Sequence, residues 1–481
     1  MSEPELRGNF VGGHWVGASG GRTFERRNPA DPADVVSVAP DSDATDVDQA
    51  VGHVATHYRE WAELAPEVRA DVLCRAADQL EQRADTLVAE LVREEGKTRA
   101  EARMEVRRAP QNLRFYAGEA QRLTGETFPT GDGSMVLTLR EPVGVVAAIT
   151  PWNFPLNIPS RKLGPALAAG NGVVFKPSEV TPLLGQRLVE ALVEAGVPGG
   201  ALALVHGHGE VGKALVSDTR IDAVTFTGST AVGEAIHANV PPWVRCQLEM
   251  GGKNAVVVCD DADLDKAAAI VVRGAFGLSG QACTGTSRVV VYESVLGGLL
   301  DRVMEAARDA VLGNGLDDGV TMGPLATEAQ LAKYHSYLAW GRGSDAMLET
   351  PRYGADPDGG FFARPAIFSG VRPDSRLAQE EIFGPILSFL TVGGYDEAVE
   401  VVNGTPYGLS SGIVTTSMAT AMAFARDART GLVKVNQPTT GMAMNAPFGG
   451  MGRSSTQTHK EQAGASMMAF YTHDKTTYFS A

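Results

Sequence analysis

A chain of 481 residues is long enough for two or three domains of about 100–200 residues each. Its net charge of −15 argues against nucleic acids or anionic membrane surfaces as main partners, because both are bound through basic patches. No apolar run approaches the ~18 residues of a membrane-spanning helix, and no secretory signal is visible. Four scattered cysteines without CxxC or histidine pairing indicate neither a disulfide framework nor a metal site. We therefore expect a cytoplasmic protein without a bound metal.

The first clear element is helical. From residue 66 to about residue 93, apolar side chains recur at spacings of three and four, which predicts one amphipathic helix. Cys74 lies within it and is interpreted as a structural cysteine.

From residue 143 onwards, short β-rich runs alternate with helices. The helix at 181–196 begins with Thr181 as the N-cap and Pro182 in its first turn, and it ends at Gly196. Strands alternating with helices are typical of parallel sheets. The fold class is therefore α/β, with two lobes that each contain a parallel sheet, a Rossmann-like lobe first. The expected strands lie in the segments 143–150, 172–178, 201–206, 221–227, 246–250, 254–259 and 287–293.

Two further segments read as strands outside these sheets. They are "SMVLTLREP" at 134–142 and the tail from residue 467 onwards. Strands in such positions often pair with another subunit, so we expect a homodimer or a homotetramer.

Two glycine patterns compete as phosphate-binding turns. "GHGEVG" at 207–212 matches GxGxxG, and "FTGSTAVG" at 226–233 also follows a strand and opens a helix. Either helix N-terminus could hold a phosphate through its free N–H groups. The patterns alone do not decide between them, and a simple tight turn is the alternative for each.

Cys283 lies in "GQACTGTSR" (280–288), among residues too small or polar for a core cysteine. This stretch occurs together with "TPWNFP" (150–155), "LEMGGKN" (248–254) and "EEIFGPI" (380–386), in this order along the chain. The combination resembles the aldehyde dehydrogenase superfamily over almost the whole chain. The resemblance implies NAD(P)-dependent oxidation of a small-molecule aldehyde to its acid.

The resemblance also assigns catalytic roles. Cys283 would attack the aldehyde and form a thioester, and Glu249 would activate the water that hydrolyses it. Asn153 would join the Cys283 backbone N–H as an oxyanion hole. Lys162 matches a site position near the cofactor and the nucleophile. Glu461 matches a carboxylate linked to proton release, with a solvated helix residue as the alternative.

For the cofactor, the resemblance selects the second glycine pattern as the pyrophosphate loop. Lys176 and Glu179 match positions at the adenosine ribose, where a carboxylate accepts from hydroxyls and repels a 2′-phosphate. We therefore expect NAD, with NADP as the alternative because Lys176 and Ser178 could serve a phosphate. The expected cofactor residues are Trp152, Lys176, Ser178, Glu179, Gly209, Gly228, Ser229, Gly233, Glu381 and Phe383.

The substrate channel departs from the family pattern. Arg161 and Gly277 stand where many relatives place aromatic side chains, and a guanidinium in an open channel suits a carboxylated aldehyde. The C-terminal stretch is similar to the 2-oxoglutarate (α-ketoglutaric) semialdehyde dehydrogenase branch. Phe154, Met442 and Phe448 would complete the channel. If Arg161 instead turns into a salt bridge, an aromatic or aliphatic aldehyde is the alternative substrate.

The sequence disfavours two other functions. A CoA-acylating semialdehyde dehydrogenase would share the fold but typically lacks the base at Glu249. A catalytically silent structural protein is disfavoured by Cys283, Glu249 and Asn153 occurring together. The expected domains are a cofactor domain at 1–125 and 143–250, a catalytic domain at 251–455, and an oligomerisation element at 126–142 and 456–481.

Overall fold

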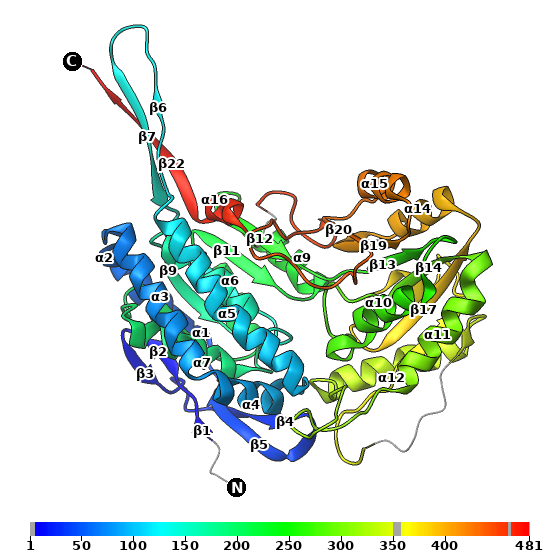
Figure 1. Cartoon of the computed structure of the whole chain (residues 1–481). Coiled ribbons are helices and arrows are strands. Elements are labelled where there is room, and N and C mark those ends of the chain that lie inside the picture. Colours follow the sequence, from blue (N-terminus) through cyan, green and yellow to red (C-terminus); the bar gives the residue numbers. More distant parts are fainter. Residues whose placement is uncertain (1–4, 350–356, 460–462, 481) are drawn as a thin grey trace.

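The computed structural model describes residues 5–349, 357–459 and 463–480. Two seven-stranded sheets, each covered by helices, lie side by side, and a narrow β-hairpin projects from the first (Figure 1). The α/β class expected from the sequence is confirmed. Within the described ranges, no helix is both long and apolar enough to cross a membrane.

The first sheet begins with five parallel strands in the order β12-β11-β8-β9-β10, and β2 and β3 extend it in antiparallel fashion. The strand β8, the middle of these five parallel strands, is buried at all five positions, as expected for a parallel sheet covered on both faces. The strands are β12 (Arg245–Glu249), β11 (Ala223–Thr227), β8 (Val145–Ile149), β9 (Gly172–Lys176), β10 (Leu202–Leu204), β2 (Asn9–Val11) and β3 (His14–Val16).

Alternate residues of these strands enter two separate cores. One face, with Val146, Val173 and Phe175, packs under five helices, and the other, with Ala147 and Val174, packs under three. The five are α3 (Pro66–Gln82), α4 (Ala84–Glu95), α5 (Arg99–Ala120), α6 (Asn157–Ala168) and α7 (Pro182–Ala195); the three are α1 (Ala44–His57), α8 (Gly209–Ser217) and α9 (Thr230–Asn239). The short α2 (Arg59–Ala62) follows α1.

One expected helix was wrong. The helix predicted over 66–93 is two helices, because the chain leaves helical geometry at Arg83 (φ −100°, ψ 11°). Thr181 is the N-cap residue of α7, as expected, although its side chain makes no cap hydrogen bond. The carboxylate of Glu94, at the end of α4, instead accepts from the N–H groups of Leu183 and Leu184 at 2.7 and 2.9 Å. A distant acidic side chain thus satisfies this helix end.

The second sheet has the order β15-β16-β17-β14-β13-β19-β20, parallel except at β15. Its strands are β15 (Met347–Leu348), β16 (Ala366–Ser369), β17 (Ile386–Val392), β14 (Arg288–Tyr292), β13 (Ala255–Val258), β19 (Ser410–Val414) and β20 (Leu432–Val435). It is covered by α10 (Leu264–Phe276) and α11 (Leu296–Arg308) on one face and by α12 (Glu328–Arg342), α14 (Tyr395–Asn403) and α15 (Met418–Asp427) on the other.

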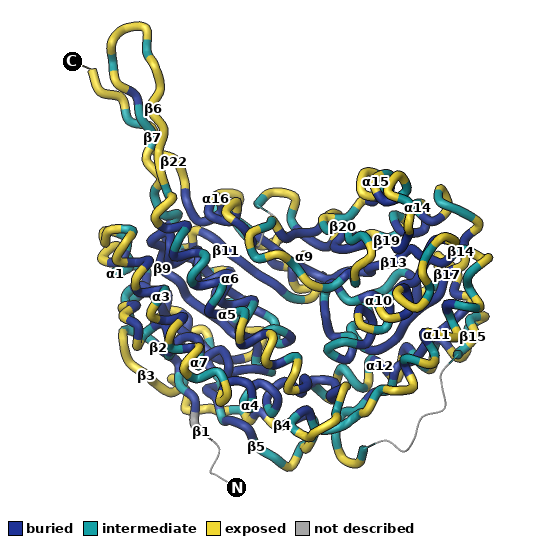
Figure 2. Tube along the Cα trace, in the orientation of Figure 1, coloured by how far each residue is buried: buried dark blue, intermediate teal, exposed yellow. Residues whose placement is uncertain are grey.

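The projecting hairpin of β6 (Thr127–Phe128) and β7 (Met135–Pro142) is joined by β22 (Thr472–Phe479) into a three-stranded sheet, and we call this sheet the arm. β22 pairs antiparallel with all of β7, from Thr472 opposite Pro142 to Phe479 opposite Met135. Both strand predictions outside the main sheets are therefore confirmed as strands. Most of the arm is exposed in the single chain (Figure 2), including the apolar side chains of Phe128, Met135, Leu139, Tyr478 and Phe479.

The remaining elements lie outside the two main sheets and their covering helices. They are the sheet of β1 (Glu5–Leu6), β5 (Asp31–Pro40) and β4 (Thr23–Asn28), the pair β18 (Tyr407–Gly408) and β21 (Met451–Gly452), the helices α13 (Arg376–Gln379) and α16 (Met468–Tyr471), and the 3₁₀ turns η1 (Gly277–Gly280), η2 (Glu293–Val295) and η3 (Ala465–Met467).

Candidate active site

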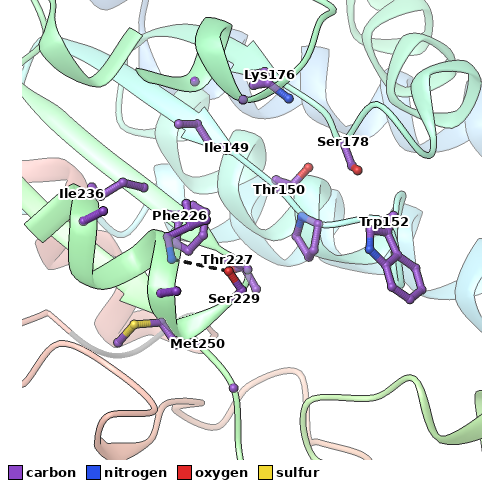
Figure 3. Close-up of a pocket in the computed structure, with 18 of the residues that line it drawn as sticks. Ile149, Thr150, Trp152, Lys176, Ser178, Phe226, Thr227, Ser229, Ile236 and Met250 are labelled. Carbon is purple, nitrogen blue, oxygen red and sulfur yellow. Dashed lines mark hydrogen bonds between the residues drawn. The ribbon is translucent and has the colours of Figure 1, made fainter. Parts of the chain in front are cut away.

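A large cavity opens at the carboxyl ends of β8, β9 and β11 (Figure 3). The chain proceeds from β8 to β9 and β10 on one side and then returns to β11 and β12 on the other, so the strand order reverses at β8. Ligands of open α/β sheets bind at such a reversal. The cavity has a volume of about 730 Å³ and extends from this edge to Cys283 of the second lobe.

Nine of the ten residues expected to hold the cofactor line this cavity. They are Trp152, Lys176, Ser178, Glu179, Gly209, Gly228, Ser229, Glu381 and Phe383. The tenth, Gly233, does not line it: a Cβ there would meet the Met250 sulfur at 2.5 Å. Gly233 therefore lets α9 approach Met250 closely, which is a packing role.

The N-termini of α8 and α9 both reach the cavity, so both glycine patterns contribute to it. Gly209 opens α8, while Gly228 and Ser229 precede α9. At Gly228 a Cβ would meet the Phe226 ring at 2.4 Å, so only glycine fits this turn. The Ser229 hydroxyl accepts from the N–H of Val232 (Figure 3). This leaves other N–H groups of the first turn of α9 for a ligand phosphate.

Charged groups flank the cavity beyond β9. The Lys176 ammonium donates to the Pro177 carbonyl at 3.0 Å and lies 3.5 Å from the Glu179 carboxylate. Burial lowers the pKa of Lys176. The cavity is also lined by Lys213 and Lys333, two cations that sequence reasoning missed, since neither lies in a recognisable motif.

The opposite wall comes from the second lobe. The rings of Trp152 and Phe383 meet edge to face, with centroids 5.5 Å apart. Phe383 has a left-handed backbone (φ 60°), a strained conformation that is often found at functional sites. The Glu381 carboxylate accepts from the Gly252 N–H at 3.0 Å, and burial raises its pKa.

Cys283 lies in the loop between η1 and β14 and is half-buried at one end of the cavity. Asn254 fixes this loop, because its side-chain amide donates to the carbonyls of Cys283 (2.8 Å) and Gly285 (2.9 Å). Burial raises the pKa of the thiol to about 12, with a further contribution from Glu249, so the neutral thiol is favoured at rest. One small neighbour has a packing role, since a Cβ on Gly280 would meet the Gly384 backbone at 2.4 Å.

Glu249 ends β12 and is only 2% exposed. One carboxylate oxygen accepts from the Ser455 hydroxyl at 2.6 Å, and the other has no hydrogen-bond partner among the described residues. Burial raises the pKa of Glu249 to about 8, and the Ser455 bond opposes that shift. A buried carboxyl with a raised pKa and a free oxygen has the properties of a general base.

The loop after β8 is held by a buried ion pair that sequence reasoning missed. The Asn153 amide donates to the Gln281 carbonyl at 2.9 Å, while its backbone carbonyl accepts from Lys97 at 2.8 Å. Lys97 pairs with Glu105 at 2.6 Å, and Glu105 accepts from the N–H groups of Leu156 and Asn157. The sequence signal was limited to a charge between α4 and α5, at Lys97, and a charge at a core-facing position of α5, at Glu105.

Lys162 does not line the cavity. Fully buried on α6, its ammonium donates to Thr225 at 2.8 Å, and Thr225 donates in turn to Gln247. Burial lowers its pKa well below the usual range, and Glu249 opposes this shift. The charge of Glu249, at the end of β12, thus acts on the ammonium of Lys162 on α6. Glu461 lies outside the described residues.

Arg161 lies one turn after Asn157 on α6, and it contacts the apolar cluster against which Cys283 packs. Its guanidinium lies 2.7 Å from the Met442 sulfur and 5.4 Å from the centre of the Phe448 ring, and Cys283, Met442 and Phe448 belong to one apolar cluster. Arg161 forms no salt bridge with any described carboxylate. Phe154 packs instead against the Lys97 ammonium, 4.8 Å from its ring centre. A Cβ on Gly277 would meet nothing within 4 Å.

Comparison with known proteins identifies extensive similarity. A family model described as the aldehyde dehydrogenase family matches residues 15–477. The chain is 42% identical over 471 residues to 2,5-dioxopentanoate dehydrogenase of Saccharolobus solfataricus, covering 96% of this chain and 97% of that protein. It is 39% identical over 480 residues to alpha-ketoglutaric semialdehyde dehydrogenase of Bacillus subtilis, covering 98% and 97%.

A solved structure shares the whole architecture. The crystal structure of an NAD-dependent aldehyde dehydrogenase from Sinorhizobium meliloti superposes with a TM-score of 0.95 at 34% identity, covering 99% of this chain and 95% of that one.

Proposed function

The chain belongs to the aldehyde dehydrogenase family and is an NAD(P)-dependent enzyme of that family, and on this premise we propose that it oxidises a carboxylated semialdehyde at Cys283. The substrate we propose is 2-oxoglutarate semialdehyde (2,5-dioxopentanoate), on which two relatives act by name. The observation that carries this proposal is Arg161, a buried cation beside the nucleophile with no described carboxylate partner.

The protein groups divide the reaction between them. Attack by the Cys283 sulfur on the aldehyde carbon forms a tetrahedral adduct, whose oxygen is held by Asn153 and the Cys283 N–H. Loss of hydride from that carbon leaves a thioester on Cys283. Glu249 then takes a proton from a water molecule, which attacks the thioester and releases the acid and the thiol. Because the pKa of Cys283 is raised, the sulfur must first lose its proton. Glu249 is the proposed acceptor, because its charge acts on Cys283 and one of its carboxylate oxygens has no hydrogen-bond partner among the described residues.

The cavity fits a nicotinamide dinucleotide. Its glycine turns at Gly209 and Gly228 leave two helix N-termini open to a pyrophosphate, and Glu179 and Glu381 offer carboxylates for ribose hydroxyls. When bound, the nicotinamide ring supplies the acceptor for the hydride. Glu179 favours NAD over NADP through repulsion of a 2′-phosphate.

Lys162 remains a predicted site position near the cofactor and the nucleophile, and its support is the effect of the Glu249 charge on its pKa. Glu461 remains a predicted carboxylate linked to proton release. Phe154, Met442 and Phe448 remain the predicted apolar part of the channel. We also retain the domain division of 1–125 with 143–250, 251–455, and 126–142 with 456–481.

Two observations support the proposed assembly and location. The exposed apolar side chains on both faces of the arm favour burial against a second copy, hence a homodimer or a homotetramer. All four cysteines are free thiols, which suits the reducing cytoplasm.

The test is a panel of aldehydes assayed with NAD and with NADP. It contains 2-oxoglutarate semialdehyde, succinic semialdehyde, pentanal and benzaldehyde, with Cys283→Ala as the control. We expect the highest kcat/KM for the carboxylated aldehydes. Equal or higher kcat/KM for pentanal or benzaldehyde would refute the substrate class but not the family chemistry.

A further inference from the structure

Two arginines from different helices converge on Met442. Arg161 of α6 reaches the Met442 sulfur at 2.7 Å, and Arg108 of α5 donates to the Met442 carbonyl at 3.2 Å. Arg161 is buried, whereas Arg108 is half-buried. Met442 therefore contacts both arginines. Arg161 is the buried one, next to the cluster that contains Cys283, and Arg108 is the one closer to solvent.

The buried member has unused hydrogen-bonding capacity. Arg161 is 6% exposed, and its Nε has no hydrogen-bond partner among the described residues. Its one described hydrogen bond is to a thioether, a weak acceptor. Arg288 is also fully buried, but it donates to three backbone carbonyls, those of Lys253, Val401 and Val402. Arg288 is thus satisfied by backbone carbonyls, whereas the described residues leave the Arg161 Nε without an acceptor.

The outer member, Arg108, also has no acidic partner in the described part of the chain. Arg108 contacts only the Gln111 side chain and the Met442 carbonyl among the residues with described placement. On the same helix, Arg114 pairs with Asp78 and Glu81. The proximity of the two cations is unfavourable in the free protein: burial lowers the pKa of Arg161, and the charge of Arg108 lowers it further. A ligand anion between them would relieve both.

We propose that Arg108 is a specificity residue that binds the outer end of a 2-oxo-carboxylate substrate together with Arg161. The inference rests on the proposed function. In 2-oxoglutarate semialdehyde the carboxylate is one carbon farther from the aldehyde than in succinic semialdehyde, and a ketone oxygen adds a third acceptor. Arg161, next to the Cys283 cluster, is placed for the nearer oxygens, and Arg108 for the farther ones.

The chain offers a matched control for this proposal. Arg107 is the preceding residue of α5, is exposed, and carries the same charge. Arg107→Leu therefore removes a positive charge from the same surface without touching Met442. Arg108→Gln keeps an amide donor for the Met442 carbonyl and serves where Arg108→Leu does not fold.

The experiment measures kcat/KM with NAD for 2-oxoglutarate semialdehyde, succinic semialdehyde and pentanal. We expect Arg108→Leu and Arg108→Gln to lose about tenfold for the 2-oxo acid, mainly through KM, the usual effect of one hydrogen bond to a charged group. Pentanal should change by less than about twofold, succinic semialdehyde should lie between, and Arg107→Leu should match the wild type.

Two results would overturn the inference alone. They are a wild-type preference for the 2-oxo acid that both Arg108 variants retain, or an equal loss for all three aldehydes. A wild-type enzyme without any preference for carboxylated aldehydes would refute the proposed substrate class, and this inference with it.

Discussion

Ser455→Ala is the sharpest test of how the environment of Glu249 sets its proton affinity. The Ser455 hydroxyl donates to the Glu249 carboxylate at 2.6 Å and opposes the burial that raises the pKa of Glu249 to about 8. A hydrogen bond to a charged group contributes about 1.5–3 kcal/mol, and one pKa unit corresponds to about 1.4 kcal/mol. Removing the donor should therefore raise the pKa of Glu249 by at least about one unit.

The consequence for rate follows from the ionised fraction, because only the carboxylate can accept a proton from water. At pH 7 a group of pKa about 8 is roughly one-tenth ionised, and a group one unit higher is roughly one-hundredth ionised. Hydrolysis of the acyl-enzyme should thus fall about tenfold at pH 7 in Ser455→Ala and approach the wild-type rate at high pH. The sign is fixed: the limb of the pH–rate profile on which the rate rises with pH moves to higher pH.

The assay is rapid-quench measurement of acyl-enzyme decay between pH 6 and pH 10. Ser454→Ala is the matched control, since that hydroxyl accepts from the Gly408 N–H and makes no hydrogen bond to Glu249. A limb at the wild-type position in Ser455→Ala, or a shift to lower pH, would refute the reasoning about Glu249.

Four further expectations follow from the site. Cys283→Ala should abolish NADH formation while NAD still quenches the fluorescence of Trp152, and measurable turnover would contradict the nucleophile. Glu249→Gln should raise the Tm at pH 8 but not at pH 4. A carboxyl whose pKa is raised on folding makes the folded protein less stable as pH rises from the unfolded pKa to the folded pKa, and glutamine removes this loss. Equal Tm gains at both pH values would argue against this. Glu105→Gln should lower kcat about tenfold or more with little change in KM, since it loosens the loop of Asn153, and a pure KM effect would exclude that positioning role. Arg161→Leu should raise KM for succinic semialdehyde far more than for pentanal, and equal effects would return Arg161 to a structural role.

The sequence predicted the parts of the fold that local pattern controls. The buried strands β8, β9, β11, β13 and β14 are short apolar runs bounded by turns, and each was predicted within a few residues of its bounds. The C-cap at Gly196 was also recognisable, because its φ of 112° suits glycine.

What the sequence could not reveal depends on groups far apart in the chain. The cap of α7 by Glu94 joins residues about 90 positions apart, and the Lys97–Glu105 pair acts on Asn153 across 56 positions. Neither leaves a periodic signal. Gly233 shows the converse error, since a glycine in a motif-like position serves packing against Met250.

The C-terminal segment carries a consequence for how the chain is made. The carbonyl of Tyr471 accepts from Val143 and Asn171, and Arg245 donates to the carbonyls of Phe470 and Thr472, so the last helix and strand complete the first lobe. On the ribosome, residues of β8 emerge more than 300 positions before these partners do. At about 5–20 residues per second, synthesis from the end of β12 at Glu249 to Tyr471 takes roughly 10–45 s, and during this time the edge of the nascent first lobe at β7 and β12 is unsealed. During that interval, chaperone binding at this edge is expected, and slowing translation of the last third of the message should increase aggregation.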